Sequence, residues 1–456
     1  MENTNNMNMQ ADTVAAEAAI FSTPSHATSN VYAMALLPTQ PKSLAETGLS
    51  QQLVTELVAK TMMAAGKIHL LVLSAKLKLS INVLNEILNF MVVEHMAEIV
   101  RRGTTETDVD YQLTIAGKKL AGEWMNRCSY IGPAPVTLKA YHDMVVLQSI
   151  RGNRVTAQDM QAAFADITLN PDVRNQVGAA MNSGRPLFLY GPAGSGKTFI
   201  SEKLNRLLPG SIAVPHAVTV ENEIIQVYDT LLHEQAAADA QPSLGRPNSD
   251  SRWVLCKRPV VVTGGELTLD MLDLTYDAIS GFYQSPPHFK ANNGIFIIDD
   301  LGRQKVSPQH LMNRWVVPMD RGRDYLALHT GYKFTVPFDV VLVFSTNLSP
   351  STIADESFLR RLGYKIYVGP LSESEYRSVF RQQAETLGIA FNEIAFSYLL
   401  YQLHQGSGRP LLACYARDLL SQMLDYARYF EEPVAMTATA FDQAWHTYFA
   451  KNDEEI

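Results

Sequence analysis

The stretch that decides the fold of this chain reads Gly191-Pro192-Ala193-Gly194-Ser195-Gly196-Lys197-Thr198. An apolar run from Leu187 to Tyr190, short enough for a buried strand, precedes it. Phe199 to Leu208 follows with apolar residues at helical spacing. A glycine-rich turn between a strand and a helix, ending in Lys-Thr, is typical of a phosphate-binding P-loop. The alternative is a glycine-rich turn with a surface lysine, and the flanking strand and helix make it the weaker interpretation.

The chemistry of such a loop follows from its residue types. Glycines allow successive backbone N–H groups to turn inward on phosphate oxygens, and the following helix adds its positive end. Lys197 is expected to reach the β- and γ-phosphates, and the Thr198 hydroxyl to hold Mg²⁺. The stretch therefore predicts a nucleoside triphosphate ligand.

Length and composition limit the remaining possibilities. A chain of 456 residues is expected to form two or three domains, and 46% hydrophobic with 18% charged residues is typical of a soluble globular protein. A net charge of −8 argues against nonspecific coating of nucleic acid, although a local basic face is compatible with it. Cys128, Cys256 and Cys414 have no pairing or metal-ligand spacing, which favours a reduced compartment. With no secretion signal or membrane-length apolar stretch in the sequence, we expect a cytoplasmic protein without membrane insertion.

Changes of pattern divide the chain into five segments. We expect a disordered tail (1–40), a winged-helix-like α+β domain (41–130), a linker (131–150), an α/β nucleotide-binding core with a parallel sheet (151–369) and a helical lid (370–456). The linker prediction rests on Ile131-Gly132-Pro133-Ala134-Pro135, since two prolines disfavour a helix. Within the core, Ala236 to Asp250 reads as a flexible loop.

The front domain is predicted from three helices, two strands and a further helix. Ser50 and Ser80 are expected to cap the first and third helices, and His69 to Leu79 forms the second. The strands are placed at 99–102 and 111–114 and the last helix at 115–127, an order that resembles a winged helix. Winged helices often read DNA with the third helix, but Ile81 to Met96 contains no Arg or Lys. Protein docking or oligomer scaffolding is at least as well supported.

Two further strands carry polar residues at their ends. Gly294-Ile295-Phe296-Ile297-Ile298 is a buried strand that ends in Asp299 and Asp300, and acids at that end of a parallel strand meet the ligand edge of an open α/β sheet. Asp299 is expected to position Mg²⁺, and Asp300 to polarise the attacking water. A third strand, 340–345, is followed by Asn347, whose amide can bond both the water and the γ-phosphate.

Together these features resemble the AAA+ ATPase superfamily from about Asp166 to Phe449. The resemblance implies ATP and Mg²⁺ as ligands and ATP hydrolysis as the reaction. Asn347 would be sensor 1, Arg361 or Arg360 in Leu359-Arg360-Arg361 an arginine finger for a neighbouring subunit, and Arg417 sensor 2, with Arg409 as a weaker candidate. The nucleotide-contacting set would then be Gly191, Pro192, Ala193, Gly194, Ser195, Gly196, Lys197, Thr198, Phe199 and Arg417, with Asp300, Asn347, Arg361 and Arg360 as catalytic residues, and Thr198 and Asp299 at the metal.

The sequence departs from the superfamily's pattern at two places. Asp299-Asp300 stands where Asp-Glu is usual at Walker B, so the second carboxylate is one methylene shorter and slow hydrolysis is compatible with the sequence. The stretch from Thr219 to Asn293 is unusually long. Within it, Gly281-Phe282-Tyr283 could grip a polypeptide in a ring's pore, although aromatic packing on the edge of the sheet is the favoured reading. The Gly-Ala-Phe-Thr-Gly-Ala loop of enhancer-binding activators is absent from the sequence.

The sequence thus favours an oligomeric ATPase, a ring or arc of identical subunits, that remodels or assembles a macromolecular partner. Its layout resembles bacterial AAA+ ATPases without an assigned function. Two alternatives remain open at this point. One is an ATP-controlled DNA-binding initiator or regulator that uses residues 41–130, and the other is an ATP-switched scaffold with negligible turnover.

Overall fold

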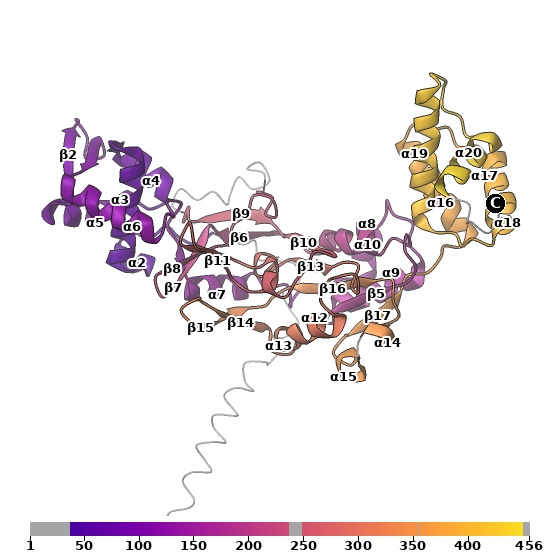
Figure 1. Ribbon diagram of the computed structural model, residues 1–456, viewed down its shortest axis with the longest axis horizontal. Helices are drawn as coiled ribbons and strands as arrows, with labels where there is room; N and C mark the ends of the chain where they lie inside the picture. Colours follow the sequence, from indigo (N-terminus) through magenta and orange to yellow (C-terminus); the bar gives the residue numbers. More distant parts are fainter. Residues whose placement is uncertain (1–36, 237–248, 354, 450–456) are drawn as a thin grey trace, which may run out of the picture. The chain divides into compact units, whose positions relative to one another are not determined.

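The computed structural model describes residues 37–236, 249–353 and 355–449 (Figure 1). The predicted tail lies outside the described residues except for 37–40, and so do most of the predicted loop between Ala236 and Asp250 and the end of the predicted lid, 450–456. None of the helices in the described ranges has both the length and the apolar character needed to cross a membrane.

A sheet of five parallel strands is the centre of the nucleotide-binding core. Its strand order is β10-β13-β16-β5-β17. The strands are β10 (Val260–Thr263), β13 (Ile295–Ile298), β16 (Val341–Thr346), β5 (Leu187–Tyr190) and β17 (Tyr364–Tyr367). Because all five run in the same direction, the ends that carry Thr263, Asp299, Asn347 and the P-loop reach the same edge of the sheet.

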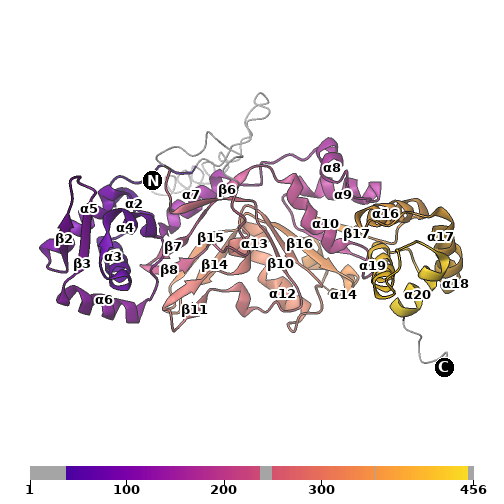
Figure 2. The ribbon, with the colours of Figure 1, turned by 90° about the horizontal axis from the view of Figure 1, so that it is seen from above.

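Helices cover both faces of this sheet, as its apolar strands require. Alternate residues serve opposite faces: Leu187 and Ile297 pack with one helical layer, and Phe188 and Phe296 with the other. The first layer contains α8 (Ala157–Ala163), α9 (Pro171–Met181), α10 (Lys197–Lys203) and the 3₁₀ turn Leu204–Leu207. The second contains α12 (Pro308–Arg314) and α13 (Val316–Arg321), around the buried Trp315. Figures 1 and 2 show the two layers on either side of the strands.

The long stretch before β13 builds a second sheet that was not predicted from the sequence. Its order is β11-β12-β8-β7-β4, with mixed strand directions. The strands are β4 (Val136–Thr137), β7 (Ala217–Val220), β8 (Glu223–Gln226), β11 (Thr275–Asp277) and β12 (Phe282–Gln284). Two antiparallel ribbons accompany it, β6 (Ser211–Pro215) with β9 (Trp253–Lys257) and β14 (Arg323–Ala327) with β15 (Lys333–Pro337). Short helical turns complete the core: Asp270–Leu272, α11 (Pro287–Lys290), α14 (Pro350–Ile353) and α15 (Glu356–Leu359).

The predicted linker, 131–150, is too long. Residues 131–135 have no helix or strand, but Val136 enters the second sheet in β4 and residues Leu138–Leu147 form α7. Tyr141, Met144 and Val145 of this helix are buried in the core that underlies the second sheet. An apolar helical face has to be covered, so this segment packs against the core domain instead of crossing between domains in solvent.

The aromatic pair at 282–283 has the packing role that the sequence analysis favoured, and the pore-gripping alternative is wrong. Both residues belong to β12, and Tyr283 is 1% exposed. Phe282 packs against the core of the front domain, with its ring 5.4 Å from that of Tyr130 in an edge-to-face arrangement. These rings are occupied by structural contacts and do not project from a free loop.

The front domain has the predicted helices and strands in the predicted order, together with a short helix, α2, and a short strand, β1, that were not predicted. It contains α2 (Leu44–Thr47), α3 (Gln51–Ala65), β1 (Ile68–His69), α4 (Leu70–Leu77), α5 (Ile81–Val93), β2 (Ala97–Arg102), β3 (Val109–Leu113) and α6 (Ile115–Arg127). The three strands form an antiparallel sheet in the order β1-β3-β2. Ser50 and Ser80 are the N-cap residues of α3 and α5 as predicted. The Ser50 hydroxyl accepts from the backbone of α3, whereas the Ser80 hydroxyl donates to the carbonyl oxygen of Pro41 and makes no capping bond to α5. The name winged helix for this arrangement stays a prediction.

The lid is helical throughout its described length. It consists of α16 (Glu373–Thr386), α17 (Glu393–Tyr398), a π-helical turn at Leu399–His404, α18 (Gln405–Ser407), α19 (Ala413–Tyr429) and α20 (Ala438–Tyr448). His404 lies in its core and is 2% exposed. Its Nε2 is 2.9 Å from the Tyr376 hydroxyl and its Nδ1 is 3.3 Å from the carbonyl oxygen of Arg409, so a neutral ring with the proton on Nδ1 satisfies both neighbours.

Burial lowers the pKa of His404 to about 4, which makes the lid sensitive to acid. Its ordinary pKa is 6.5, so the unfolded chain binds the proton first as the pH falls and the folded state loses stability between about pH 6.5 and pH 4. We expect His404 to cost about 2 kcal/mol of stability at pH 5 relative to pH 7.5. Urea unfolding of the full chain at both pH values should show a smaller acid effect in His404→Gln, and an identical effect in both proteins would contradict the assignment.

Candidate active site

The P-loop leaves strand β5 of the parallel sheet and leads directly into α10, as predicted. Gly191, Gly194 and Gly196 have φ angles of 149°, 82° and 97°. A Cβ atom on Gly191 would overlap the carbonyl oxygen of Val368, and one on Gly194 would overlap the Cys414 sulfur of the lid. The loop therefore depends on glycine both for its backbone conformation and for the close approach of β17 and the lid.

Lys197 lies in the concave side of this loop and is 6% exposed. Its ammonium group donates to the carbonyl oxygens of Gly191 and Pro192, at 3.0 and 2.8 Å, and to Oδ1 of Asn347, at 2.9 Å. Burial lowers the pKa of Lys197, whereas the nearby carboxylates of Asp299 and Asp300 act in the opposite direction. The three bonds use all three N–H donors of the ammonium group, so Lys197 can bind a further acceptor only by exchange.

Thr198 and Asp299 are brought into direct contact by the sheet. The Thr198 hydroxyl donates to Oδ2 of Asp299 at 2.7 Å, although the residues are 101 positions apart in the chain. The backbone of Asp299 is fixed as well, because its N–H donates to the Thr263 carbonyl oxygen on the neighbouring strand at 2.8 Å. A hydroxyl and a carboxylate side by side are the hard oxygen ligands that Mg²⁺ prefers.

Asp300 and Asn347 form the next part of the site. The Asn347 amide donates to Oδ1 of Asp300 at 3.3 Å, while its oxygen accepts from Lys197. Asp300 has a φ angle of +48°, in the left-handed region that is uncommon for residues other than glycine. The Arg303 guanidinium lies 3.8 Å from the Asp300 carboxylate and is largely exposed. A continuous polar chain thus runs from Lys197 through Asn347 to Asp300.

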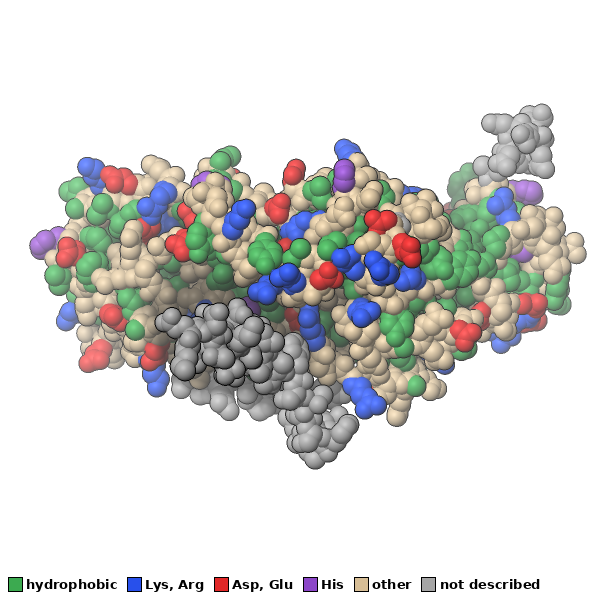
Figure 3. Space-filling model, turned by 90° about the horizontal axis from the view of Figure 1, so that it is seen from below, with side chains coloured by type: hydrophobic (Ala, Val, Ile, Leu, Met, Phe, Trp, Pro, Cys, Tyr) green, Lys and Arg blue, Asp and Glu red, His purple; other side chains and the backbone are tan. Residues whose placement is uncertain are grey.

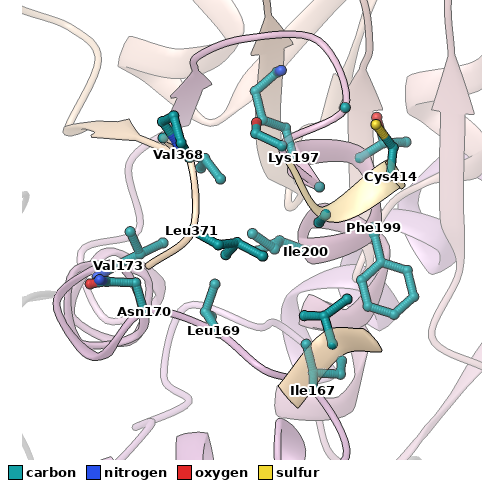
Figure 4. Close-up of a pocket in the computed structure, with 18 of the residues that line it drawn as sticks. Ile167, Leu169, Asn170, Val173, Lys197, Phe199, Ile200, Val368, Leu371 and Cys414 are labelled. Atoms are coloured by element: carbon teal, nitrogen blue, oxygen red, sulfur yellow. The ribbon is translucent and has the colours of Figure 1, made fainter. Parts of the chain in front are cut away.

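These residues line one end of a cavity of about 860 Å³. The rest of its wall comes from segments far apart in the sequence, which Figure 4 shows around the P-loop, and combines apolar side chains with polar ones such as Thr168, Asn170 and Gln382. The apolar lining consists of Ile167, Leu169, Val173, Ile200, Val368, Leu371 and Val379. Phe199 and Cys414 also line the cavity, as does the exposed side chain of Arg417. A polar end with an apolar chamber suits a ligand that carries phosphates on one side and a flat ring system on the other.

The residues fit a bound nucleotide with its metal ion. The Ser195 hydroxyl oxygen is buried and has no hydrogen-bond partner in the described part of the structure, so it is free to bond a phosphate oxygen. The glycine conformations turn the loop around the space next to it. Thr198 and Asp299 would hold Mg²⁺ beside those phosphates.

The predicted arginines are divided between two places. Arg417 lines the cavity, and its guanidinium is bonded to the neighbouring Asp418 at 3.0 Å. Arg409 does not line the cavity. Its guanidinium lies over the Phe449 ring, 4.0 Å from the ring centre. Arg360 and Arg361, at the end of α15, do not line the cavity either, and Arg361 pairs with Asp320 at 3.1 Å. This chain's own cavity therefore contains neither of the two candidate finger residues.

Sequence reasoning missed the apolar chamber and the polar residues just after the acid pair. The apolar residues belong to ordinary helices and loops, and no local pattern separates them from core residues. Arg303 and Gln304 follow Asp299 closely in the sequence, and this short spacing could have indicated that they lie near the acid pair. What their side chains contact follows only from the tertiary structure.

Comparisons with known proteins bear on the lid and on the fold. A family model described as a domain of unknown function (DUF8689) matches residues 372–447, within the lid. No curated protein matches this chain. Among solved structures, the chain resembles NtrX from Brucella abortus at 14% identity and a TM-score of 0.38, covering 62% of this chain and 57% of that one. It also resembles the RuvB Holliday junction branch migration motor from Thermotoga maritima at 13% identity and a TM-score of 0.35, covering 67% and 75%.

The parallel sheet, the P-loop between β5 and α10, the acid pair after β13 and the helical lid are all present in the described residues. The chain has an α/β fold in which a glycine-rich loop and two acids meet at one edge of a parallel sheet.

Proposed function

We propose that this protein binds Mg-ATP and hydrolyses it, and that it acts as an oligomer that remodels or assembles a macromolecular partner. The observation that carries the proposal is the set of contacts between the P-loop and the strand ends. Thr198 bonds Asp299, and Lys197 reaches Asp300 through Asn347. These contacts join a phosphate-binding loop to a metal ligand and to a candidate base.

The chain's residues divide the work as follows. Lys197 exchanges its carbonyl partners for phosphate oxygens, and its charge stays in a buried environment where it interacts strongly. Asn347 orients the attacking water without adding charge, and Asp300 accepts that water's proton. Mg²⁺ held by Thr198 and Asp299 would neutralise charge on the phosphate oxygens. The apolar residues of the cavity would contact the remainder of the ligand.

Oligomer formation is part of the proposal because the cavity lacks a finger arginine of its own. Arg361 and Arg360 lie at the end of α15, outside the cavity. In a ring or arc of identical subunits, one of them would reach the nucleotide of the neighbour and compensate charge on the transferred phosphoryl group. Arg417 would act in its own subunit, from the lid.

The structure supports the DNA-binding alternative less well than the ATPase. The front-domain helix α5 contains no Arg or Lys, and Arg101 of β2 is already bonded to Asp108 and Asp110 at 2.7 and 3.0 Å. A DNA phosphate would have to compete with these two carboxylates for Arg101. The scaffold alternative differs from the proposal only in the rate of ATP turnover. Because the Asp300 carboxylate is one methylene shorter than the usual Glu, slow turnover is compatible with the site, and a measured rate decides between the two.

Replacement of Lys197 should weaken nucleotide binding. Lys197→Met removes the charge that phosphate oxygens would meet, and a lost charged hydrogen bond corresponds to a loss in affinity of about tenfold or more. Calorimetric titration with Mg-ATP measures the effect. Lys333→Met, which alters an exposed lysine on β15, is the control and should bind as the wild type does. Equal affinity of the two variants would rule out the P-loop assignment.

Replacement of Asp300 should separate binding from hydrolysis. Asp300→Asn keeps the size of the side chain but removes the base, so phosphate release should fall by about 100-fold or more while the affinity for ATP changes little. Asp270→Asn, at an exposed acid, is the matched control. Tight ATP binding without phosphate release by the wild type would favour the scaffold, and unchanged turnover of Asp300→Asn would exclude Asp300 as the base.

A mixing experiment tests whether the finger arginine acts between subunits. Arg361→Ala and Asp300→Asn should each be inactive alone. In a random mixture, a subunit with Asp300 can stand beside one with Arg361, so turnover should recover to about a quarter of the wild-type rate. The same mixture made with Arg360→Ala shows which of the two arginines is responsible. Absence of recovery in both mixtures would contradict the intersubunit site.

A further inference from the structure

Gln304 lies just behind the acid pair and makes three hydrogen bonds. Its amide nitrogen donates to the carbonyl oxygens of Gly264 and Asp299, at 3.1 and 3.0 Å, and its oxygen accepts from the N–H of Gly302 at 2.9 Å. The residue is 8% exposed. It does not line the nucleotide cavity. All three of its contacts are with backbone groups.

Each of these contacts is with a backbone group next to the site. Asp299 follows β13 directly, and Gly264 follows the neighbouring strand β10. The last bond of the strand ladder runs from the Asp299 N–H to Thr263. Gln304 continues the connection between the two strands by one further step, because it bonds both carbonyl groups that lie beyond the ladder.

The turn held in this way is in an unfavourable conformation. Asp300 has a φ angle of +48° and Gly302 one of 107°. A left-handed residue other than glycine costs free energy and persists only where its surroundings enforce it. Two further bonds to β16 fix the other side of the turn, from the Leu301 N–H to Ser345 at 2.8 Å and from the Thr346 hydroxyl to Leu301 at 2.6 Å. Gln304 is the side chain that fixes the β10 side.

We propose that Gln304 is a positioning residue for the acid pair: it holds Asp299 against Thr198, and Asp300 within reach of Asn347. This inference rests on the proposed function, because it assigns Gln304 a role in how that site binds its metal and hydrolyses ATP. Residues that orient a metal ligand typically change metal affinity or activity by about 10-fold to 100-fold when replaced.

The test uses a matched pair of glutamines in the full-length protein. Gln304→Met keeps the length of the side chain and removes its hydrogen bonds. Gln148→Met is the control, because Gln148 is 6% exposed and also makes three bonds, two with Ala213 and one with Asn293, at 2.9 to 3.0 Å. Both variants should lose comparable thermal stability. A role limited to packing would therefore affect them equally.

Three quantities are measured for each protein: the melting temperature, the turnover of ATP, and the ratio of ATP affinities with and without Mg²⁺. We expect Gln304→Met to lower turnover and the Mg²⁺-dependent gain in affinity by about tenfold each, with metal-free affinity unchanged. Gln148→Met should preserve both. Gln304→Glu keeps the acceptor for Gly302 and loses the two donations, so it should show the same losses if the Met variant does not fold.

The outcomes separate the inference from the proposed function. Equal turnover and equal Mg²⁺ dependence in the two Met variants would overturn the role of Gln304 and leave the ATPase assignment intact. A wild type that binds ATP without turnover would remove the hydrolysis proposal, while the Mg²⁺ ratio would still decide whether Gln304 holds Asp299. A wild type that binds no nucleotide would overturn both.

Discussion

The parallel alignment of β13, β16 and β5 is the constraint on which the rest of this site depends. Adjacent strands that run in the same direction bring their carboxyl ends to one edge, so Asp299, Asn347 and the P-loop meet there although they are separated by up to 156 positions in the chain. The bond from Thr198 to Asp299 at 2.7 Å follows from this alignment. A sheet of parallel apolar strands is stable only when both of its faces are covered, and the two helical layers cover them here.

The polar end of the cavity is a linked network of side chains. Lys197, Asn347 and Asp300 are connected in series, so the position of each depends on the next. The lysine uses two of its N–H donors on its own loop and the third on Asn347, which means that a ligand has to compete with protein acceptors for it. Behind the network, Gln304 bonds the backbone at two strand ends. Rigid support of this kind keeps reacting groups in place while a ligand enters and leaves.

The lid and the second sheet surround this centre in different ways. The lid meets the P-loop through the backbone bond from Cys414 to Gly194 at 3.0 Å, and it contributes Leu371 and Arg417 to the cavity wall. The second sheet does not line the cavity, and its two faces pack on different cores. Ala217 and Ile224 belong to the core of the front domain, whereas Val218 and Ile225 belong to the core of the sheet's other face. Tyr283 is buried and Phe282 packs against the core of the front domain, so an aromatic pair in a long insertion need not mark a substrate-gripping loop.

The sequence by itself determined the local elements and the chemistry they carry. A glycine-rich turn needs no distant partner to be recognised, and the same holds for a four-residue apolar strand that ends in Asp299 and Asp300, or for Ser50 before α3. Only the tertiary structure decided the second sheet, the burial of α7 in place of a longer linker, the apolar chamber and the contacts of Gln304. These depend on pairing and packing between residues far apart in the chain, whose register is set by the burial of whole faces and has no counterpart in local spacing.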